Sequence, residues 1–186
     1  MPAISDPGIE LVRTCIENDI SINVLPGPSA SLVALVLSGL NTERFTFIGF
    51  LPEKSTQRIK ELEELKEYKE TLIFYEAPHR IKKFLTDLYG VFGNRKVSIS
   101  RELTKYYEET KRGDLSTLIE NLEDLKEKGE FVVVVEGYTK VNIEIDIKKE
   151  IKKLLEEGYS KKDAVKFLVK EYDLKKNEVY EISLEL

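Results

Sequence analysis

The order of apolar and polar positions divides the chain into an alternating region and a helical tail. In the first three quarters, short apolar runs predict strands. Between them lie stretches whose apolar residues recur every three or four positions, which predicts helices. This alternation is typical of an α/β protein. The predicted strands are Ser21–Leu25, Phe45–Phe50, Thr71–Tyr75, Lys96–Ser100 and Phe131–Val135.

The residues at the ends of the helical stretches indicate where each helix begins and stops. Asp6 and Pro7 match an N-cap followed by a first helical residue, and Ser55 matches the cap of a charged helix. We expect most of that charged helix to be a solvated face, with Ile59, Leu62 and Leu65 on its apolar side. The predicted helices run from Pro7 to about Asp19, from Ser31 to Ser38 before Gly39, from Ser55 to Glu70, from Pro78 onward, and from Leu115 to Lys128 before Gly129.

Phe131–Val135 consists of five apolar residues, which is typical of a strand buried on both faces. After Gly137 the strand signals fade and three helical patterns follow. The first ends at Gly158, and the third starts at about Lys175. Ser160 begins the second, with Asp163 three residues later in a capping-box arrangement. The tail is therefore predicted to be a helical extension covering residues 142–186.

Polar or turn residues follow three of the predicted strands. The strand Ser21–Leu25 leads into the turn PGPSA at 26–30, and Thr71–Tyr75 leads into Glu76, His79 and Arg80. Lys96–Ser100 leads into the mixed-charge run RELTKYYEETKRG at 101–113. Ligands of open α/β sheets bind outside the carboxyl ends of the strands. The three segments are therefore predicted to form one composite site.

Each of these segments also has a structural interpretation. Backbone N–H groups after PGPSA could receive a carboxylate or phosphate, but the segment could equally be an ordinary strand-to-helix turn. His79 is the only histidine, and a lone histidine is often structural. The charged run offers cations for phosphates and carboxylates for proton transfer, and Tyr106 and Tyr107 could stack on bases. Alternatively, the charged run is simply a solvated surface of the protein.

Composition narrows the class of protein. The chain has 186 residues, of which 41% are hydrophobic and 34% charged, and no apolar run approaches the roughly 20 residues that span a bilayer. Its net charge of −5 argues against nonspecific coating of nucleic acid but leaves room for a local basic patch. The single cysteine, Cys15, cannot form an internal disulfide, and Asp6 and Glu10 interrupt any signal peptide. These features favour the cytoplasm and make a metal site unexpected.

Several motifs together resemble one known family. In order they are SDPG (5–8), PGPSA (26–30), RFTFIGFLPEKS (44–55), TLIFYEAPHR (71–80), SRELTK (100–105), RGDL (112–115) and GEFVVVVEG (129–137). The chain resembles the tetrapyrrole methylases, or class III methyltransferases. FYEAPHR and RELTK are similar to the subfamily that modifies small-subunit ribosomal RNA. The resemblance implies transfer of a methyl group from S-adenosyl-L-methionine to a cytidine 2′-hydroxyl of 16S rRNA. It also implies a homodimer that works on the small ribosomal subunit.

The resemblance implies two α/β domains with the cofactor between them and assigns a role to individual residues. Residues 1–42 would be the end of the cofactor-binding domain, 43–141 the second domain, and 142–186 the extension. A proton must leave the hydroxyl, and which side chain takes it is open; no metal is implied. The cofactor-binding residues would be Pro26, Gly27, Pro28, Ser29, Ala30 and Glu76. Glu102, Lys105 and Glu108 would lie near the hydroxyl, and His79, Arg80, Arg101 and Arg112 would contact the RNA.

The family begins with a strand, a glycine-containing cofactor loop and a later acidic segment directly ahead of SDPG, and here Met1 falls inside that motif. We therefore expect an N-terminally truncated chain that lacks roughly 60–90 residues, about two βαβ units. Two alternatives remain. The chain could be an inactive fragment that serves as an RNA-binding or interaction module. It could also belong with the class III methylases that act on small tetrapyrroles, in which case an apolar trough would replace the Arg/Lys rim.

Overall fold

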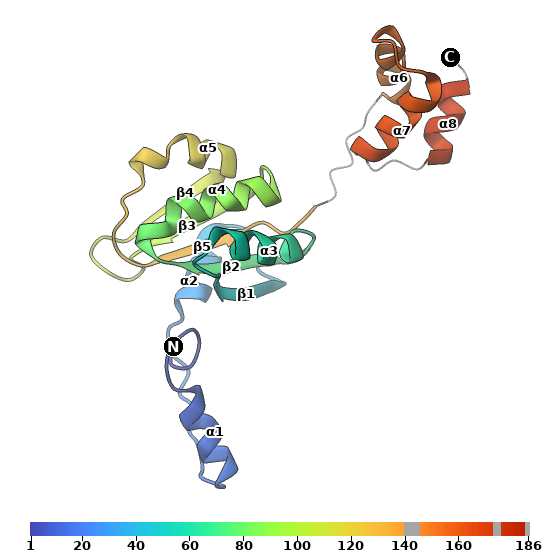
Figure 1. Ribbon diagram of the computed structural model, residues 1–186. Coiled ribbons are helices and arrows are strands. Elements are labelled where there is room, and N and C mark those ends of the chain that lie inside the picture. The colour runs from blue at the N-terminus through green and yellow to red at the C-terminus, as the bar shows by residue number, and fades with distance from the viewer. Residues whose placement is uncertain (140–145, 173–175, 185–186) are drawn as a thin grey trace. The chain divides into compact units, whose positions relative to one another are not determined.

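A computed structural model of the chain describes residues 1–139, 146–172 and 176–184 (Figure 1). The chain divides into two compact units, Met1–Thr139 and Lys140–Leu186. The first unit contains α1 (Ile9–Glu17), α2 (Ala30–Ser38), β1 (Phe45–Phe50), α3 (Ser55–Leu65), β2 (Thr71–Glu76), a 3₁₀ turn (Pro78–Arg80), α4 (Ile81–Phe92), β3 (Lys96–Arg101), β4 (Glu109–Asp114), α5 (Leu115–Glu120), a second 3₁₀ turn (Leu122–Asp124) and β5 (Phe131–Val135).

The five strands form one sheet in the order β1-β2-β5-β3-β4. β1 is parallel to β2, whereas β5 is antiparallel to both of its neighbours, β2 and β3. β1, β2 and β3 therefore point the same way, and their carboxyl ends share one edge with the start of β5. All five residues of β5 are buried, which confirms the central strand predicted from its sequence.

Helices cover both faces of the sheet, which confirms the predicted α/β class (Figure 1). On one face, Leu62 of α3 and Phe84 and Leu88 of α4 pack against alternate residues of the strands, such as Phe74 and Val133. On the other face, Ala34 and Leu35 of α2 pack against the residues of opposite parity, Ile73, Val132 and Val134. The alternation along each strand thus sets which side chains reach each layer.

A buried ion pair joins α3 to α4. Arg58 has only 2% of its surface exposed, and its guanidinium donates to Asp87 Oδ2 through Nε at 2.8 Å and Nη2 at 2.5 Å. Ser55 is the first residue of α3 and not its cap. Its Oγ donates to the same Asp87 carboxylate and makes no cap hydrogen bond. Ser55 as a cap was therefore a wrong prediction. Arg58 is also an exception to the predicted solvated face.

Two predicted elements near the chain start differ from the structure. Ser21–Leu25 is not a strand: its residues are exposed, and no strand in residues 1–139 pairs with it. Apolar periodicity alone cannot supply the backbone partners that a strand requires. Helix α1 begins at Ile9, two residues later than predicted, because Gly8 precedes it with a φ of 132° and serves as the N-cap. Asp6 therefore does not cap this helix.

Two further predictions fail in the second half of the first unit. The charged run after β3 is not entirely a loop, because Glu109–Asp114 forms β4 and pairs with all of β3. Charged residues suit an edge strand. Because β4 contains no apolar run, its sequence does not predict a strand. The predicted helix Leu115–Lys128 is also too long: α5 ends at Glu120. Its leucines still reach the core, with Leu115 and Leu125 buried.

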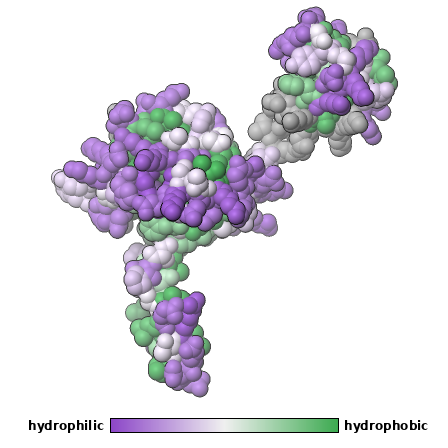
Figure 2. Space-filling view, viewed as in Figure 1, coloured by the Kyte–Doolittle hydropathy of each residue, from purple (hydrophilic) through white to green (hydrophobic). Residues whose placement is uncertain are grey.

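Helix α1 has no buried residue. Apolar side chains on and beside it are exposed, including Leu11 at 70%, Ile16 at 64% and Leu25 at 83%. Figure 2 shows apolar patches between polar ones over the N-terminal helix. The core of the first unit is therefore built without α1.

The second unit has its own core. Its helices are α6 (Ile147–Glu156), α7 (Lys161–Tyr172) and α8 (Lys176–Leu184), and the buried residues Ile151, Leu168 and Val179 bring the three together. Ser160 Oγ accepts from the Asp163 amide at 3.2 Å and donates to its carboxylate at 2.6 Å, which confirms the predicted cap of α7. The predicted start of the third helix, Lys175, lies outside the described residues. No helix among the described residues combines the length and the apolar character that crossing a bilayer requires.

Candidate functional site

The carboxyl ends of β2 and β3 lie on either side of the first residue of β5. Phe131 is the register partner of Glu76 on one side and of Arg101 on the other. Phe50 ends the parallel strand β1 at the same edge. Segments that follow strands far apart in sequence, at Glu76 and at Arg101, are therefore neighbours in space.

A cavity of about 430 Å³ opens at this edge. Aromatic rings form part of its wall: Phe50 and Tyr75 meet edge to face with ring centroids 5.6 Å apart, and Phe131 lies beside them in the lining. The segment before α1 and the first residue of α2, Ala30, close it from the other side. The sequence does not indicate that these aromatic residues line a site, because aromatic residues at these strand positions are equally expected in a hydrophobic core.

Glu76 is a buried carboxylate in the lining of this cavity, with 2% of its surface exposed. Its Oε1 accepts hydrogen bonds from the Ala77 amide at 2.7 Å and from Arg80 Nε. Arg80 also donates to the Leu51 carbonyl at 3.2 Å, so its guanidinium is held from both sides. The other oxygen, Oε2, is buried and has no hydrogen-bond partner among the described residues. Half of this carboxylate is therefore satisfied, and half is not.

A second group of charges lies at the turn between β3 and β4. Lys105 Nζ donates to Glu102 Oε1 at 2.9 Å and to Glu130 Oε2 at 3.0 Å. Glu102 Oε1 also accepts from the Glu130 amide at 3.0 Å. Gly129 makes room for this arrangement: a Cβ there would stand 2.4 Å from Glu102 Cγ. The turn is therefore fixed to Glu130, just before β5, through the carboxylates of Glu102 and Glu130 and through the hydrogen bond that the Glu102 amide donates to the Glu130 carbonyl.

These contacts change the proton affinities of two candidate residues. The hydrogen bonds from Lys105 and from the Glu130 amide lower the pKa of the Glu102 carboxyl. The hydrogen bonds to Glu102 and Glu130 raise the pKa of the Lys105 ammonium. Glu102 is thus a stable carboxylate and Lys105 a stable cation at neutral pH. Glu108 is exposed, and its Oε2 accepts from the Thr104 amide at 2.6 Å within the same turn.

Arg101 is buried beneath this turn. Its Nη2 pairs with Glu109 at 3.2 Å, and its Nη1 donates to the Lys128 carbonyl at 3.5 Å. Its Nε has no partner among the described residues. Arg101 and Glu102 line a further hollow of about 550 Å³ together with Tyr107, Lys126, Glu127, Lys128 and Gly129. Lys126 and Lys128 were not among the residues predicted for the site.

The remaining predicted residues lie apart from this centre or at its margin. Arg112 is paired with Ser98, well along β4 from Arg101, and its Nε donates to the Leu37 carbonyl at 2.6 Å. His79 is exposed in the 3₁₀ turn that follows Glu76. Pro26, Gly27 and Pro28 are exposed, and a Cβ on Gly27 would meet nothing within 4 Å. Ser29 Oγ shares a hydrogen bond of 2.9 Å with Ser31 Oγ.

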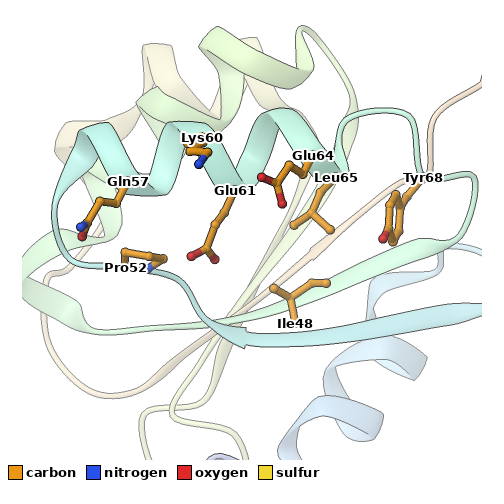
Figure 3. A pocket seen from close by; sticks show the side chains of 8 residues that line it. All are labelled: Ile48, Pro52, Gln57, Lys60, Glu61, Glu64, Leu65 and Tyr68. Atoms are coloured by element: carbon orange, nitrogen blue, oxygen red, sulfur yellow. The ribbon is translucent and has the colours of Figure 1, made fainter.

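A separate open hollow of about 610 Å³ lies between α3 and β1 (Figure 3). Ile48 rises from β1, and Gln57, Glu61 and Glu64 extend from α3 over it (Figure 3). None of the predicted site residues is among the eight that line it. This groove therefore holds none of the chemistry predicted from the sequence.

Comparison with known proteins agrees with the fold and the position of these motifs. Residues 1–119 match the family model for Tetrapyrrole (Corrin/Porphyrin) Methylases. The chain belongs to this family. The family and the fold class predicted from the motifs are thereby confirmed.

Two tetrapyrrole methylase relatives are each named Ribosomal RNA small subunit methyltransferase I. The protein from Halalkalibacterium halodurans is 44% identical to the chain, and the match covers 98% of the chain and 65% of the relative. The protein from Synechocystis sp. is 40% identical, and the match covers 100% of the chain and 68% of the relative. The chain thus spans about two thirds of the length of these relatives.

Solved structures of tetrapyrrole methylases share the fold at low sequence identity. The methyltransferase CobJ superposes with a TM-score of 0.53 at 18% identity, over 73% of this chain and 61% of that chain. A uroporphyrin-III C-methyltransferase from Thermus thermophilus, solved in complex with S-adenosylhomocysteine, superposes with a TM-score of 0.50 at 12% identity. That match covers 72% of this chain and 61% of that chain.

Proposed function

We propose that the chain is the larger part of an S-adenosyl-L-methionine-dependent methyltransferase that modifies the 2′-hydroxyl of a cytidine in 16S rRNA. The observation that carries the proposal is the match to relatives named for methylation of small-subunit rRNA, at up to 44% identity over nearly the whole chain. The cavity at the strand ends supports it, because it joins FYEAPHR to the start of β5 and lies beside RELTK.

Two of the segments predicted to contact the cofactor meet at the cavity: Glu76 lines it at the end of β2, and Ala30 lines it at the start of α2. We propose that Glu76 and residues 26–30 contact S-adenosyl-L-methionine. When bound, its sulfonium would supply an electrophilic methyl group. The segment that the resemblance places before Met1 would supply the rest of the binding site.

The charged turn would serve the substrate hydroxyl. Lys105 is held protonated by two carboxylates, so we propose that it stabilises negative charge on the oxygen and does not take the proton. Glu102 and Glu108 remain the carboxylates that could accept it, and positioning would supply most of the rate.

The structure changes which cations are best placed for RNA. Arg80 is engaged with Glu76, and Arg112 is engaged with the Leu37 carbonyl. Arg101 is engaged as well, with Glu109 and the Lys128 carbonyl. Lys126 and Lys128 are exposed at the hollow that Arg101 lines, so we propose these two lysines as phosphate contacts, with Arg101 behind them and His79 at the rim. A basic rim, in place of an apolar trough, favours RNA over a small tetrapyrrole. We also propose a cytoplasmic homodimer that acts on the small ribosomal subunit.

A methyl-transfer assay tests this function. The 186-residue chain and a version extended upstream with the matching segment of the Halalkalibacterium halodurans relative would each receive labelled S-adenosyl-L-methionine and unmethylated small ribosomal subunits. We expect the extended version to place one label on a cytidine 2′-oxygen, and the shorter chain to transfer little. Transfer to uroporphyrinogen but not to the subunits would contradict the proposal. Sedimentation of the extended version tests the homodimer.

A further inference from the structure

The two edge strands of the sheet differ sharply in composition. β4 reads ETKRGD, and its charged residues discourage another chain from pairing with it. β1 forms the opposite edge and reads FTFIGF, with no charged residue. Aromatic and β-branched residues favour strand pairing. β1 therefore lacks the charges that protect the other edge of the same sheet.

The backbone of β1 presents hydrogen-bonding groups on its outer side. The Arg44 carbonyl accepts from the Thr71 amide at 3.2 Å, and Thr71 is the register partner of Phe45. Because backbone groups alternate in direction along a strand, the N–H and C=O of Phe45 and Phe47 point away from β2. No strand among residues 1–139 lies on that side of β1. The regular register ends at a bulge after Phe47, so the open edge is short.

The groove between α3 and β1 adjoins this edge. Ile48 of β1, with Leu65 and Tyr68 at the end of α3 and just after it, gives the groove an apolar surface. Tyr68 is 42% exposed. An extended peptide beside β1 would direct every second side chain into this groove. An edge strand with a groove next to it is the arrangement by which sheets bind peptides as an added strand.

The charges of the groove indicate what occupies it. Glu61 and Glu64 extend over it from α3, and Lys60 is the only cation among its lining residues (Figure 3). Within the described part of the chain neither carboxylate has an ion pair, whereas Glu63 on the same helix pairs with Lys66. Two unpaired carboxylates repel RNA phosphates, and a second copy of the chain would bring the same carboxylates to the interface. A cationic peptide is the complementary occupant.

We propose that β1 and this groove bind an extended basic segment of another protein. The segment adds to the sheet as a strand beside Phe45–Phe47 and places lysine or arginine side chains against Glu61 and Glu64. Backbone hydrogen bonds provide affinity, and the alternating side chains provide specificity. Peptide binding at this edge requires no methyl transfer, so the inference goes beyond the proposed function and does not depend on it.

Hydrogen exchange of the 186-residue chain, followed by NMR at low salt, tests the proposal. The probe is the peptide TKTVTKT with blocked ends, whose two lysines and valine share one side of a strand. The control peptide TTKVKTT has the same composition but places the valine opposite the lysines. At saturation we expect TKTVTKT to slow exchange of the Phe45 and Phe47 amides about tenfold. The Thr46 amide, which points to β2, should stay protected with and without peptide.

Variants of α3 test the contribution of charge. The double substitution Glu61→Gln and Glu64→Gln should weaken binding of TKTVTKT about fivefold. Glu63→Gln is the matched control, because Glu63 lies on the same helix outside the groove lining, and it should leave binding unchanged. All three residues are exposed, so these variants are expected to fold.

Four results would overturn the proposal. The first is equal binding of TTKVKTT, and the second is no added protection at about 1 mM TKTVTKT. The third is protection of Phe45 and Phe47 that rises with protein concentration alone, which would assign the edge to a second copy of the chain. The fourth is stronger protection by an oligouridylate than by the peptide. The methyl-transfer assay measures the proposed function separately, so either can fail without the other.

Discussion

At the residue scale, single groups decide the geometry of the strand-end edge. Glu102 has a φ of 51°, a conformation that most side chains avoid, and its carboxylate receives Lys105 and the Glu130 amide. Gly129 has a φ of 87° and leaves the space that this carboxylate occupies. The turn therefore depends on one glycine and one strained glutamate that face each other.

Replacing Gly129 with alanine should disorder this turn. The new Cβ would stand 2.4 to 2.6 Å from Glu102 Cγ, Cδ and Oε1, and the backbone there disfavours any side chain. We expect a loss of stability of about 1 kcal/mol or more in urea unfolding, together with loss of the Lys105–Glu102 contact in NMR spectra. Gly90→Ala is a control, because a Cβ on Gly90 meets nothing within 4 Å. An unchanged Glu102 in the Gly129 variant would contradict this account.

The pH dependence of stability should carry a contribution from Glu102. Its pKa is lowered from the ordinary 4.5 in the folded chain, so its contribution is present above that value and is lost as the pH falls through the folded pKa. The pKa of Lys105 is raised from 10.5, so its contribution is complete below that value and is lost only as the pH rises through the folded pKa. Between these two values neither Glu102 nor Lys105 should titrate.

We therefore expect the Lys105→Met variant to show a shallower fall in unfolding free energy than the parent between about pH 7 and pH 3. The reason is that the carboxyl of Glu102 returns toward its ordinary pKa once the ammonium is gone. Urea unfolding across this range measures the difference. Identical slopes would mean that Lys105 does not depress the pKa of Glu102 in solution.

At the scale of elements, a buried charge pair fixes one helix on another. Arg58 occupies the inner side of α3, where the apolar pattern placed Ile59, and Ile59 is 38% exposed. The guanidinium also donates to the Pro52 and Glu53 carbonyls, at 3.2 and 2.9 Å. It thus ties the segment after β1, helix α3 and helix α4 together. That segment also leads away from the strand end at Phe50.

Replacing Asp87 with alanine should cost about 3 kcal/mol of stability, because it leaves Arg58 buried without its counter-charge. Equilibrium unfolding in urea measures this. The control is Lys66→Ala, which removes an exposed pair with Glu63 at 2.6 Å and should change stability far less than Asp87→Ala does. A similar small loss in both variants would mean that the Arg58–Asp87 pair is effectively solvated.

At the scale of the whole molecule, the chain consists of two units with separate cores. The first unit ends at Thr139, shortly after β5 ends at Val135. In the described part of the second unit, α6, α7 and α8 pack around Ile151, Leu168 and Val179. The residues that line the strand-end cavity and the hollow at Arg101, as well as the charged turn itself, all lie in the first unit.

Removing the second unit should separate binding from recognition. We expect the upstream-extended version, cut after Thr139, to fold and bind S-adenosyl-L-methionine but to methylate small ribosomal subunits more slowly. The reason is that we propose the helical unit for docking on folded RNA or on the partner subunit. Calorimetry and the methyl-transfer assay provide the two measurements. Undiminished methylation would remove the docking role, and failure to fold would place the unit in the core.

The sequence by itself determined the features that depend on local spacing. The buried strand Phe131–Val135, the helix Ser31–Ser38 ending at Gly39, and the Ser160–Asp163 cap were all predicted, and each is present with bounds within one residue. In each of them, a periodicity or a cap lies within a few consecutive residues. The motifs also identified the family, because short sequence strings in a fixed order can be recognised without knowing which residues are in contact.

The tertiary structure alone decided what depends on pairing between distant segments. It showed that Glu109–Asp114 is a strand, because β3 supplies the backbone partners that the charged sequence does not reveal. It placed Phe131 between Glu76 and Arg101, which made two separate motifs neighbours. It also left Glu76 Oε2 without a donor among the residues that the structure describes, a property that exists only once the contacts of the buried carboxylate are fixed. The strand Glu109–Asp114 and the position of Phe131 depend on the order of the strands in the sheet, which no local spacing encodes. The state of the Glu76 carboxylate depends on its burial.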